Sequence, residues 1–423
     1  MPPSLHAVLG ASSAHRWLAC TPSARLCERL EGRFGKKSSP YAEEGTKAHA
    51  LGELKIRYAL WKADGMTMAK FGKLPAAEKE GYEGINVNRY KALRKDLIDN
   101  SGDIPEDMEK ATDSYCDVVI ERLLRARESD PSAQLFLEQR LDYSKWVPGG
   151  FGTGDALIVS DSLLDVMDYK HGKGVSVSAE ENPQMRLYAL GALSRFGQLY
   201  DFYNIRCTII QPRINNLSEE YLDRGKLGVW VAKEVVDKAR LAWEGAGEFH
   251  SGEHCRFCAA KAVCSARVAE ALKIFNYGLA GSGELSDEQI AAILPSLDAA
   301  EAWIKDIREY TENCAVQGQK FTGYKLVRGK RPNRKWSDEG EVKAQLLRNG
   351  YGVEQIEETK LKAVGEIEKT IGKKAFRALL GDLVSQGEGR LQLVPEDDPR
   401  PEYNSADAAF GDLTETETTS DDV

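Results

Sequence analysis

Three short segments of β-type sequence follow one another between residues 134 and 170, and they constrain the fold more than any other part of the chain. Each is a short run of residues with the composition of a strand, and a tight turn at 160–162 joins the last two. The segments are residues 134–141 (QLFLEQRL), 153–160 (TGDALIVS) and 163–170 (LLDVMDYK). We expect a meander of three strands here, with the side chains of alternate residues on the same face.

Upstream of the meander the sequence is mainly helical. Residues 43–63 have helical composition, and a mostly helical stretch continues to about residue 129. Pro75 and the Ser-Gly-Asp turn at 101–103 interrupt this stretch.

Downstream of the meander a helix and a further strand follow. Asn182 offers an N-cap and Pro183 a first-turn proline to a helix that ends near residue 196. Residues 203–211 (YNIRCTIIQ) have the composition of a strand. The order of helix, three strands, helix and strand predicts an α/β fold.

The meander also carries the residues with the most chemistry. Asp168 and Lys170 are two apart in the third strand and therefore share a face, and the turn brings Asp155 of the second strand beside Asp168. Two carboxylates and a lysine suit metal-dependent hydrolysis of a phosphodiester, and Gly152 and Gly154 would let a phosphate backbone approach. Taken alone, such a pair is more often an exposed strand face.

Residues outside the second and third strands support the chemical interpretation. His49 and Glu53 lie four apart on the upstream helix, where a neutral imidazole could complete a metal shell. Gln184 and Tyr188 are likewise four apart on the following helix, where they can position a phosphate or a carboxylate. Glu138 on the first strand is a further possible ligand or a surface residue.

These motifs, in this order, resemble the RecB-type branch of the PD-(D/E)XK nucleases. The resemblance rests on G-T-x-x-H at 45–49, G-T-G-D at 152–155, D-x-K at 168–170 and Q-x-x-x-Y at 184–188, and it covers roughly residues 1–270. Within that branch the chain is most similar to phage and prophage proteins of a family of unknown function, which open with a segment like SSAHRWLAC.

The resemblance implies a restriction-endonuclease-like core, in which a central mixed sheet is flanked by helices, and a Mg²⁺- or Mn²⁺-dependent DNA nuclease. An exonuclease that acts on DNA ends in phage replication or recombination is the expected activity. A catalytically silent DNA-binding or recombination scaffold with the same fold is the alternative. The resemblance implies metal ligation by His49, Asp155 and Asp168, catalysis by Lys170, and supporting roles for Gln184, Tyr188 and Glu138.

A second constellation consists of cysteines. Cys255, Cys258 and Cys264 form C-x2-C-x5-C, a spacing that indicates a metal site, and the fourth ligand is not local. RecB-like nucleases with an iron-sulfur cluster take one cysteine from before the nuclease core and three from after it, so the resemblance implies a 4Fe-4S cluster with Cys20 as the fourth ligand and Cys27 in reserve. Structural Zn²⁺ is the alternative, because two histidines, at positions 250 and 254, lie beside the triplet.

The charges show how the remaining chain is organised. The segment 395–423 holds ten acidic residues and one arginine, which equals the formal net charge of -9 of the whole chain. We expect a nuclease domain at 1–275 with a helical insertion at about 60–130, a helical linker at 276–320, a basic and helical module at 321–394, and a disordered acidic tail. A basic stretch in that module suits DNA phosphates: Lys325, Arg328, Lys330, Arg331, Arg334 and Lys335.

Composition excludes several classes of protein. The chain has no run of eighteen apolar residues and does not begin with the basic-then-apolar order of a secretory signal. A cytoplasmic location with no membrane contact is therefore expected. DNA is the expected partner. For the acidic tail three interpretations stay open: it could fold back over the basic stretch and compete with DNA phosphates, dock on a basic partner such as a single-strand-binding or annealing protein, or serve only to solubilise the chain. No phosphate-binding loop of the G-x-x-x-x-G-K-[ST] type occurs, which argues against a helicase.

Overall fold

The computed structural model describes residues 7–34, 40–74, 85–273, 286–356, 361–387, 389–395 and 398–403. The chain divides into two compact units, Met1–Ala300 and Glu301–Val423. The first unit contains the meander and all residues of the expected metal and cysteine sites, and the second contains the basic segment.

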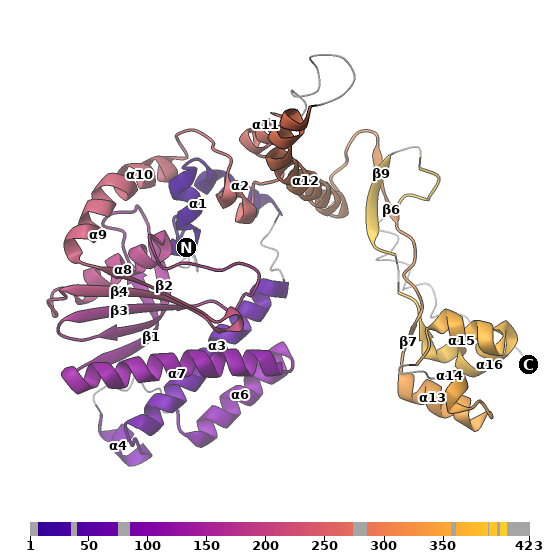
Figure 1. Cartoon of the computed structure of the whole chain (residues 1–423), viewed down its shortest axis with the longest axis horizontal. Coiled ribbons are helices and arrows are strands. Elements are labelled where there is room, and N and C mark those ends of the chain that lie inside the picture. The colour runs from indigo at the N-terminus through magenta and orange to yellow at the C-terminus, as the bar shows by residue number, and fades with distance from the viewer. Residues whose placement is uncertain are drawn as a thin grey trace, which may run out of the picture. The chain divides into compact units, whose positions relative to one another are not determined.

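The first unit is built around a five-stranded mixed sheet (Figure 1). Its strands lie in chain order: β1 (Gln134–Asp142), β2 (Phe151–Val159), β3 (Leu163–Tyr169), β4 (Asn204–Gln211) and β5 (Asn216–Leu222). Neighbouring strands are antiparallel except β3 and β4, which are parallel and joined by helix α8 (Pro183–Phe196). The expected α/β class and the meander are confirmed, whereas β5 was not predicted.

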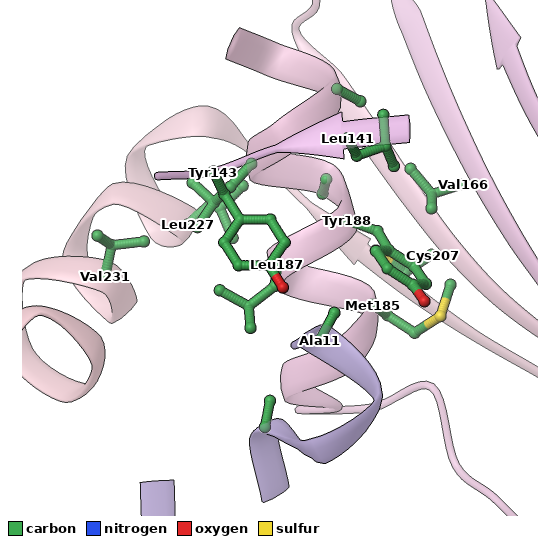
Figure 2. Packing of buried hydrophobic residues seen from close by; sticks show 14 of the residues in the cluster. Ala11, Leu141, Tyr143, Val166, Met185, Leu187, Tyr188, Cys207, Leu227 and Val231 are labelled. Atoms are coloured by element: carbon green, nitrogen blue, oxygen red, sulfur yellow. The ribbon is translucent and has the colours of Figure 1, made fainter. Parts of the chain in front are cut away.

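One face of the sheet packs against α8 and the helices that follow β5. Val166 of the sheet, Leu187 of α8 and Leu227 of α9 lie in one buried cluster (Figure 2). Leu157 of the sheet belongs to the same cluster. The helices beyond β5 are α9 (Arg224–Trp230) and α10 (Val236–Glu244). As expected, Asn182 caps α8 by accepting hydrogen bonds from the amides of Gln184 and Met185.

The other face of the sheet packs against the helices that precede β1. Ala156 and Met167 share a second buried cluster with residues of α3 and α7, so β2 and β3 are covered on both faces and apolar along most of their length. Lys47, on α3, is buried and donates to the carbonyls of residues 101–103 at the C-terminal end of α6, where helix carbonyls lack partners. These helices are α3 (Pro40–Ala63), α4 (Met68–Lys73), α6 (Val87–Ser101) and α7 (Glu106–Ser129).

The N-terminal segment folds back onto the end of the same unit. Thr21 Oγ1 donates to the carbonyl of Ala246 at 2.7 Å, and Arg25 Nε donates to that of Trp243 at 2.6 Å. These contacts bring the first helices next to the cysteine triplet. The elements involved are η1 (Ala11–Ser13), α1 (Ala14–Ala19), α2 (Ser23–Phe34), η4 (Glu253–Phe257) and α11 (Ser265–Leu272).

The described part of the second unit begins within helix α12 (Asp287–Val316), which crosses the boundary at Ala300, and contains two short β-ladders and further helices. Strand β6 (Tyr324–Arg328) pairs with β9 (Leu391–Pro395), and β7 (Lys335–Trp336) pairs with β8 (Val384–Ser385). Helix α12 precedes them, and the other helices are α13 (Glu339–Arg348), α14 (Val353–Ile356), α15 (Val364–Ile371) and α16 (Lys373–Leu380). Val342, Ile367 and Phe376 belong to the buried core of this unit.

Part of the acidic segment is ordered against this unit. Pro395 ends β9, and the amide of Tyr403 donates to the carbonyl of Leu326 in β6 at 2.6 Å. Residues 396–397 and 404–423, for which we expected disorder, lie outside the described residues. Among the described helices, none combines the length and the apolar character needed to span a bilayer.

The close approach of α8 to β1 predicts the effect of one substitution. A Cβ atom on Gly191 would lie 2.7 Å from Cβ of Leu141 and 3.0 Å from its carbonyl carbon. We expect Gly191→Ala to lower the free energy of unfolding by about 1–3 kcal/mol, because the helix must shift from the sheet. Thermal denaturation followed by circular dichroism measures the effect.

Gly228→Ala is the matched control, because Gly228 lies in α9 and a Cβ there would have no heavy atom within 4 Å. It should leave the melting temperature unchanged or raise it, since alanine favours the helix. Equal melting temperatures for both variants would contradict this account of the helix–sheet contact.

Candidate metal and cysteine sites

The candidate metal site lies where β2 separates from β3. The pairing of these strands ends at Ala156 and Met167, and Asp155 and Asp168 are the next residues along each strand. The ladder between β1 and β2 also lacks the pair opposite Asp155, and Glu138 has a φ of 48° there. A left-handed residue other than glycine costs about 1–3 kcal/mol, which the surrounding structure has to offset. The carboxylates therefore face a local opening in the sheet.

The first part of the site consists of His49, Glu138 and Asp155. One ligand atom from each lies within 4.8 Å of the others. Nδ1 of His49 is 3.4 Å from Oδ1 of Asp155, and Oδ2 of Asp155 accepts a hydrogen bond of 2.7 Å from the amide of Tyr169. Two carboxylates and one imidazole are a donor set that suits Mg²⁺ or, better, Mn²⁺.

The second part is a hydrogen-bonded chain centred on Gln184. Its Nε2 donates to Oδ1 of Asp168 at 2.9 Å, and its Oε1 accepts from Nζ of Lys170 at 3.2 Å. Nζ of Lys170 is also 2.9 Å from Oδ2 of Asp168, and Nε2 of Gln184 donates to the hydroxyl of Tyr188 at 3.2 Å. All the residues expected in the metal and catalytic sets thus lie in the same region, on β1, β2, β3, α3 and α8.

The pKa shifts in the candidate metal site reflect several carboxylates that lie close together and are largely shielded from solvent. Burial, reinforced by the charge of Asp155, raises the pKa of Glu138 to about 7. Burial also raises the pKa of Asp168, against the effect of Lys170. Burial opposes the charged form of His49, but Asp155 outweighs it and raises the pKa of His49 to about 9. A cation would relieve the repulsion among these carboxylates.

The carboxylate of Asp168 favours the charged form of Lys170. Burial opposes the ammonium, but Asp168 more than compensates, so the pKa of Lys170 is raised. Asp168 thus favours the ammonium form of Lys170, which donates hydrogen bonds.

The glycines before Asp155 have a different role from the one that the sequence suggested. A Cβ on Gly152 would lie 2.6 Å from Cε1 of Tyr188, and a Cβ on Gly154 would lie 2.9 Å from Cδ1 of Leu141. The space beside both glycines is therefore filled by side chains. They allow close packing of α8 and β1.

Tyr169 and His171 are site residues that the sequence did not single out. The ring of Tyr169 makes an edge contact with His49, with centroids 5.3 Å apart, and its hydroxyl is 2.8 Å from Nδ1 of His171. Nε2 of His171 is in turn 3.2 Å from a carboxylate oxygen of Glu44 on α3. The position of Tyr169 inside the D-x-K motif was the only available signal, because its partners are distant in sequence.

The second candidate site is formed by cysteines. Cys20, Cys255, Cys258 and Cys264 are buried and line one small cavity, together with the two neighbouring histidines. Sγ of Cys27 is 3.5 Å from Sγ of Cys258, so this reserve cysteine lies at the edge of the same group. Nowhere in the described chain do three cysteine sulfurs lie within 4.8 Å of one another. The other cysteines are buried elsewhere: Cys116, Cys207 and Cys314.

The basic segment belongs to the second unit and is only partly available for ligands. Arg334 forms an ion pair with Glu368, and the guanidinium of Arg328 lies 5.2 Å from the ring centre of Tyr403. Exposed side chains in this segment include Lys330, Arg331 and Lys335.

Comparison with known proteins identifies a matching protein family. The sequence matches the model of the family described as "Protein of unknown function (DUF2800)" over residues 6–401. The chain is also similar to the protein in "Crystal structure of SSO0001", with 12% sequence identity and a TM-score of 0.20; the match covers 57% of this chain and 95% of that one. A score this low carries no argument about fold or function. The family match agrees with the expectation of an uncharacterised family.

The protonation of His49 and Glu138 predicts a pH-dependent affinity for metal. Both groups have to lose a proton before they can bind a cation, with pKa values of about 9 and about 7. The affinity for Mn²⁺ should therefore rise from about pH 6 to pH 8.5, by up to about tenfold per pH unit for each proton released. Calorimetric titration in buffers of different ionisation enthalpy measures both quantities.

His49→Ala should flatten the upper part of this pH dependence. His15→Ala is the control, because His15 is an exposed residue of α1 and should leave the dependence unchanged. An affinity for Mn²⁺ that does not change with pH would contradict ligation by His49.

Proposed function

The chain belongs to the DUF2800 family, whose function is unknown, and we propose that it is a metal-dependent DNA nuclease of the RecB-like PD-(D/E)XK type. Its activity would be exonucleolytic hydrolysis at DNA ends, in phage replication or recombination. The competing function is a DNA-binding scaffold that has the same fold and no activity.

The observation that carries this proposal is the hydrogen-bonded chain from Asp168 through Gln184 to Lys170, beside Asp155. A buried ion pair contributes little to stability, because its desolvation offsets its attraction. The amide that holds both charged groups in place therefore favours a chemical role for them. A silent scaffold would have no need for this arrangement.

The residues of the site fit a divalent cation and divide into two roles. His49, Glu138, Asp155 and Asp168 would hold Mg²⁺ or Mn²⁺, which supplies charge neutralisation at a phosphate and an acidified water. Lys170, as an ammonium, would donate to the attacking water or to a phosphate oxygen and so orient them. Gln184 would fix Lys170 relative to Asp168.

The cysteines support a 4Fe-4S cluster more than a zinc ion. A tetrahedral zinc site holds its four sulfurs about 3.8 Å apart, given Zn–S bonds of about 2.3 Å. In the described chain no three cysteine sulfurs lie within 4.8 Å of one another. Cys20 and the three cysteines of the triplet line the same cavity. Four thiolates around one cavity are the ligand set that a 4Fe-4S cluster takes.

Cleavage of labelled DNA tests the nuclease proposal. With Mn²⁺ or Mg²⁺, Asp168→Ala and Lys170→Ala should each lower the cleavage rate by at least about a hundredfold, since both groups would act on the reacting phosphate. DNA affinity should change little. His49→Ala should weaken activity and regain part of it at higher Mn²⁺.

Lys173→Ala is the matched control, because Lys173 is an exposed lysine three residues beyond Lys170. Its cleavage rate should equal that of the wild type. Full activity of Lys170→Ala would refute the assignment, and wild-type protein that binds DNA but never cleaves it would favour the scaffold.

The colour and metal content of the purified protein test the cluster. Protein prepared without oxygen should be brown and contain about four iron atoms per chain. Cys20→Ala should remove the colour and lower the melting temperature, whereas Cys314→Ala, in the second unit, should change neither. Colourless protein with stoichiometric zinc would show that the metal is zinc instead.

A further inference from the structure

A chain of polar side chains connects the candidate metal site with three further parts of the first unit. The hydroxyl of Tyr169, at the end of β3, is 2.8 Å from Nδ1 of His171, whose Nε2 is 3.2 Å from a carboxylate oxygen of Glu44 on α3. Arg213, in η2 (Pro212–Ile214), donates to the same oxygen of Glu44 at 2.8 Å and to Asp107 of α7 at 2.5 Å. The chain thus joins β3, α3, α7 and the connection between β4 and β5.

The order of hydroxyl, imidazole and carboxylate is that of a catalytic triad, but burial excludes this role. Tyr169 has no surface exposed to solvent, and His171 is only 5% exposed, so no substrate atom can reach the hydroxyl. Both ring nitrogens of His171 have partners, which leaves neither for a metal. The chain therefore acts through the residues it touches and not on a substrate.

The chemistry of the partners fixes the direction of both hydrogen bonds. The carboxylate of Glu44 can only accept, so Nε2 of His171 donates to it. Burial lowers the pKa of His171 and favours the neutral imidazole, whose Nδ1 then accepts from the hydroxyl of Tyr169. One buried ring therefore holds both Tyr169 and Glu44.

The two ends of this hydrogen-bonded chain reach the ligands of the candidate metal site. The amide of Tyr169 donates to the carboxylate of Asp155, and its ring lies between two contacts, an edge contact with His49 and a stack on Tyr115 of α7 with centroids 4.7 Å apart. Glu44 precedes His49 by five residues on the same helix. The bond from the hydroxyl fixes the Tyr169 ring beside His49, and the bond to Glu44 fixes the helix that carries His49.

We propose that His171 is a positioning residue of the metal site, which holds Tyr169 and α3 so that His49 and Asp155 can share one divalent cation. This inference rests on the proposed function, because the cation is the one proposed for the nuclease. Residues that contact the ligands of a metal rather than the metal itself orient those ligands, and their loss typically costs about 10–100-fold in metal affinity. Buried polar groups of this kind add little net stability, because their desolvation offsets their attraction.

Removing one hydrogen bond at a time tests the inference. Glu44→Ala deletes the acceptor of the His171 bond, and Tyr169→Phe deletes the hydroxyl but keeps the ring. Glu44→Gln is the conservative variant, because its amide oxygen can still accept from Nε2 of His171. Glu43→Ala is the matched control, since it removes a carboxylate from an exposed neighbouring position of α3. Calorimetric titration with Mn²⁺ in the absence of DNA measures the affinity, and circular dichroism measures the melting temperature.

We expect Glu44→Ala and Tyr169→Phe each to lower the affinity for Mn²⁺ by about tenfold or more while the protein stays folded. His171→Leu, which removes both bonds, should lose at least as much as either of them. Glu44→Gln should keep most of the wild-type affinity, because the hydrogen bond to His171 is retained although the charge is lost. Glu43→Ala should bind Mn²⁺ as the wild type does.

The outcomes separate this inference from the proposed nuclease activity. Binding of Mn²⁺ by the wild type, with unchanged affinity in folded Glu44→Ala and Tyr169→Phe, would overturn the positioning role and leave the metal site. Equal losses in Glu44→Ala and Glu44→Gln would assign the effect to charge and overturn it as well. Tenfold losses that Glu44→Gln restores, in a protein that cleaves no DNA with Mn²⁺, would support the positioning role and refute the nuclease.

Discussion

The separation of β2 from β3 at Asp155 and Asp168 is the constraint on which the rest of the site depends. Where strands pair, their amides bind the neighbouring strand; where pairing stops, those groups need other partners. Here the amide of Tyr169 donates to the side-chain carboxylate of Asp155 instead of to a backbone carbonyl of β2. This hydrogen bond gives the Tyr169 amide a partner where the β2–β3 ladder stops. It also holds the carboxylate of Asp155 beside His49. Glu138 contributes its carboxylate to the site from a left-handed backbone conformation.

Close packing of α8 completes the arrangement. Gly191 lets the helix touch β1 and Gly152 lets Tyr188 lie against β2, so Gln184 at the start of the helix can reach Asp168. The close packing of α8 against the sheet therefore sets the position of the hydrogen-bond donor to Asp168. A shift of α8 would disturb the hydrogen bonds of Asp168 before it exposed much apolar surface.

The N-terminal helices and the cysteine segment join parts of the chain that are more than 200 residues apart. Side-chain bonds such as that from Thr21 to Ala246 hold these parts together, and a metal cluster there would close the loop covalently. Closing so long a loop restricts the unfolded chain strongly. The N-terminal helices also line a cavity together with Tyr188 of α8.

The sequence by itself determined the features that depend on neighbours along the chain. The period of two predicted the meander and put Asp168 and Lys170 on one face, and Asn182 with its proline predicted the start of α8. It did not predict β5, whose polar, exposed sequence resembles a loop and which forms only because β4 offers an edge. It also could not predict the left-handed Glu138 or the packing role of Gly152. Both follow from where a ladder ends and how closely a helix approaches, and these are decided by contacts between residues far apart in the chain, which no local period encodes.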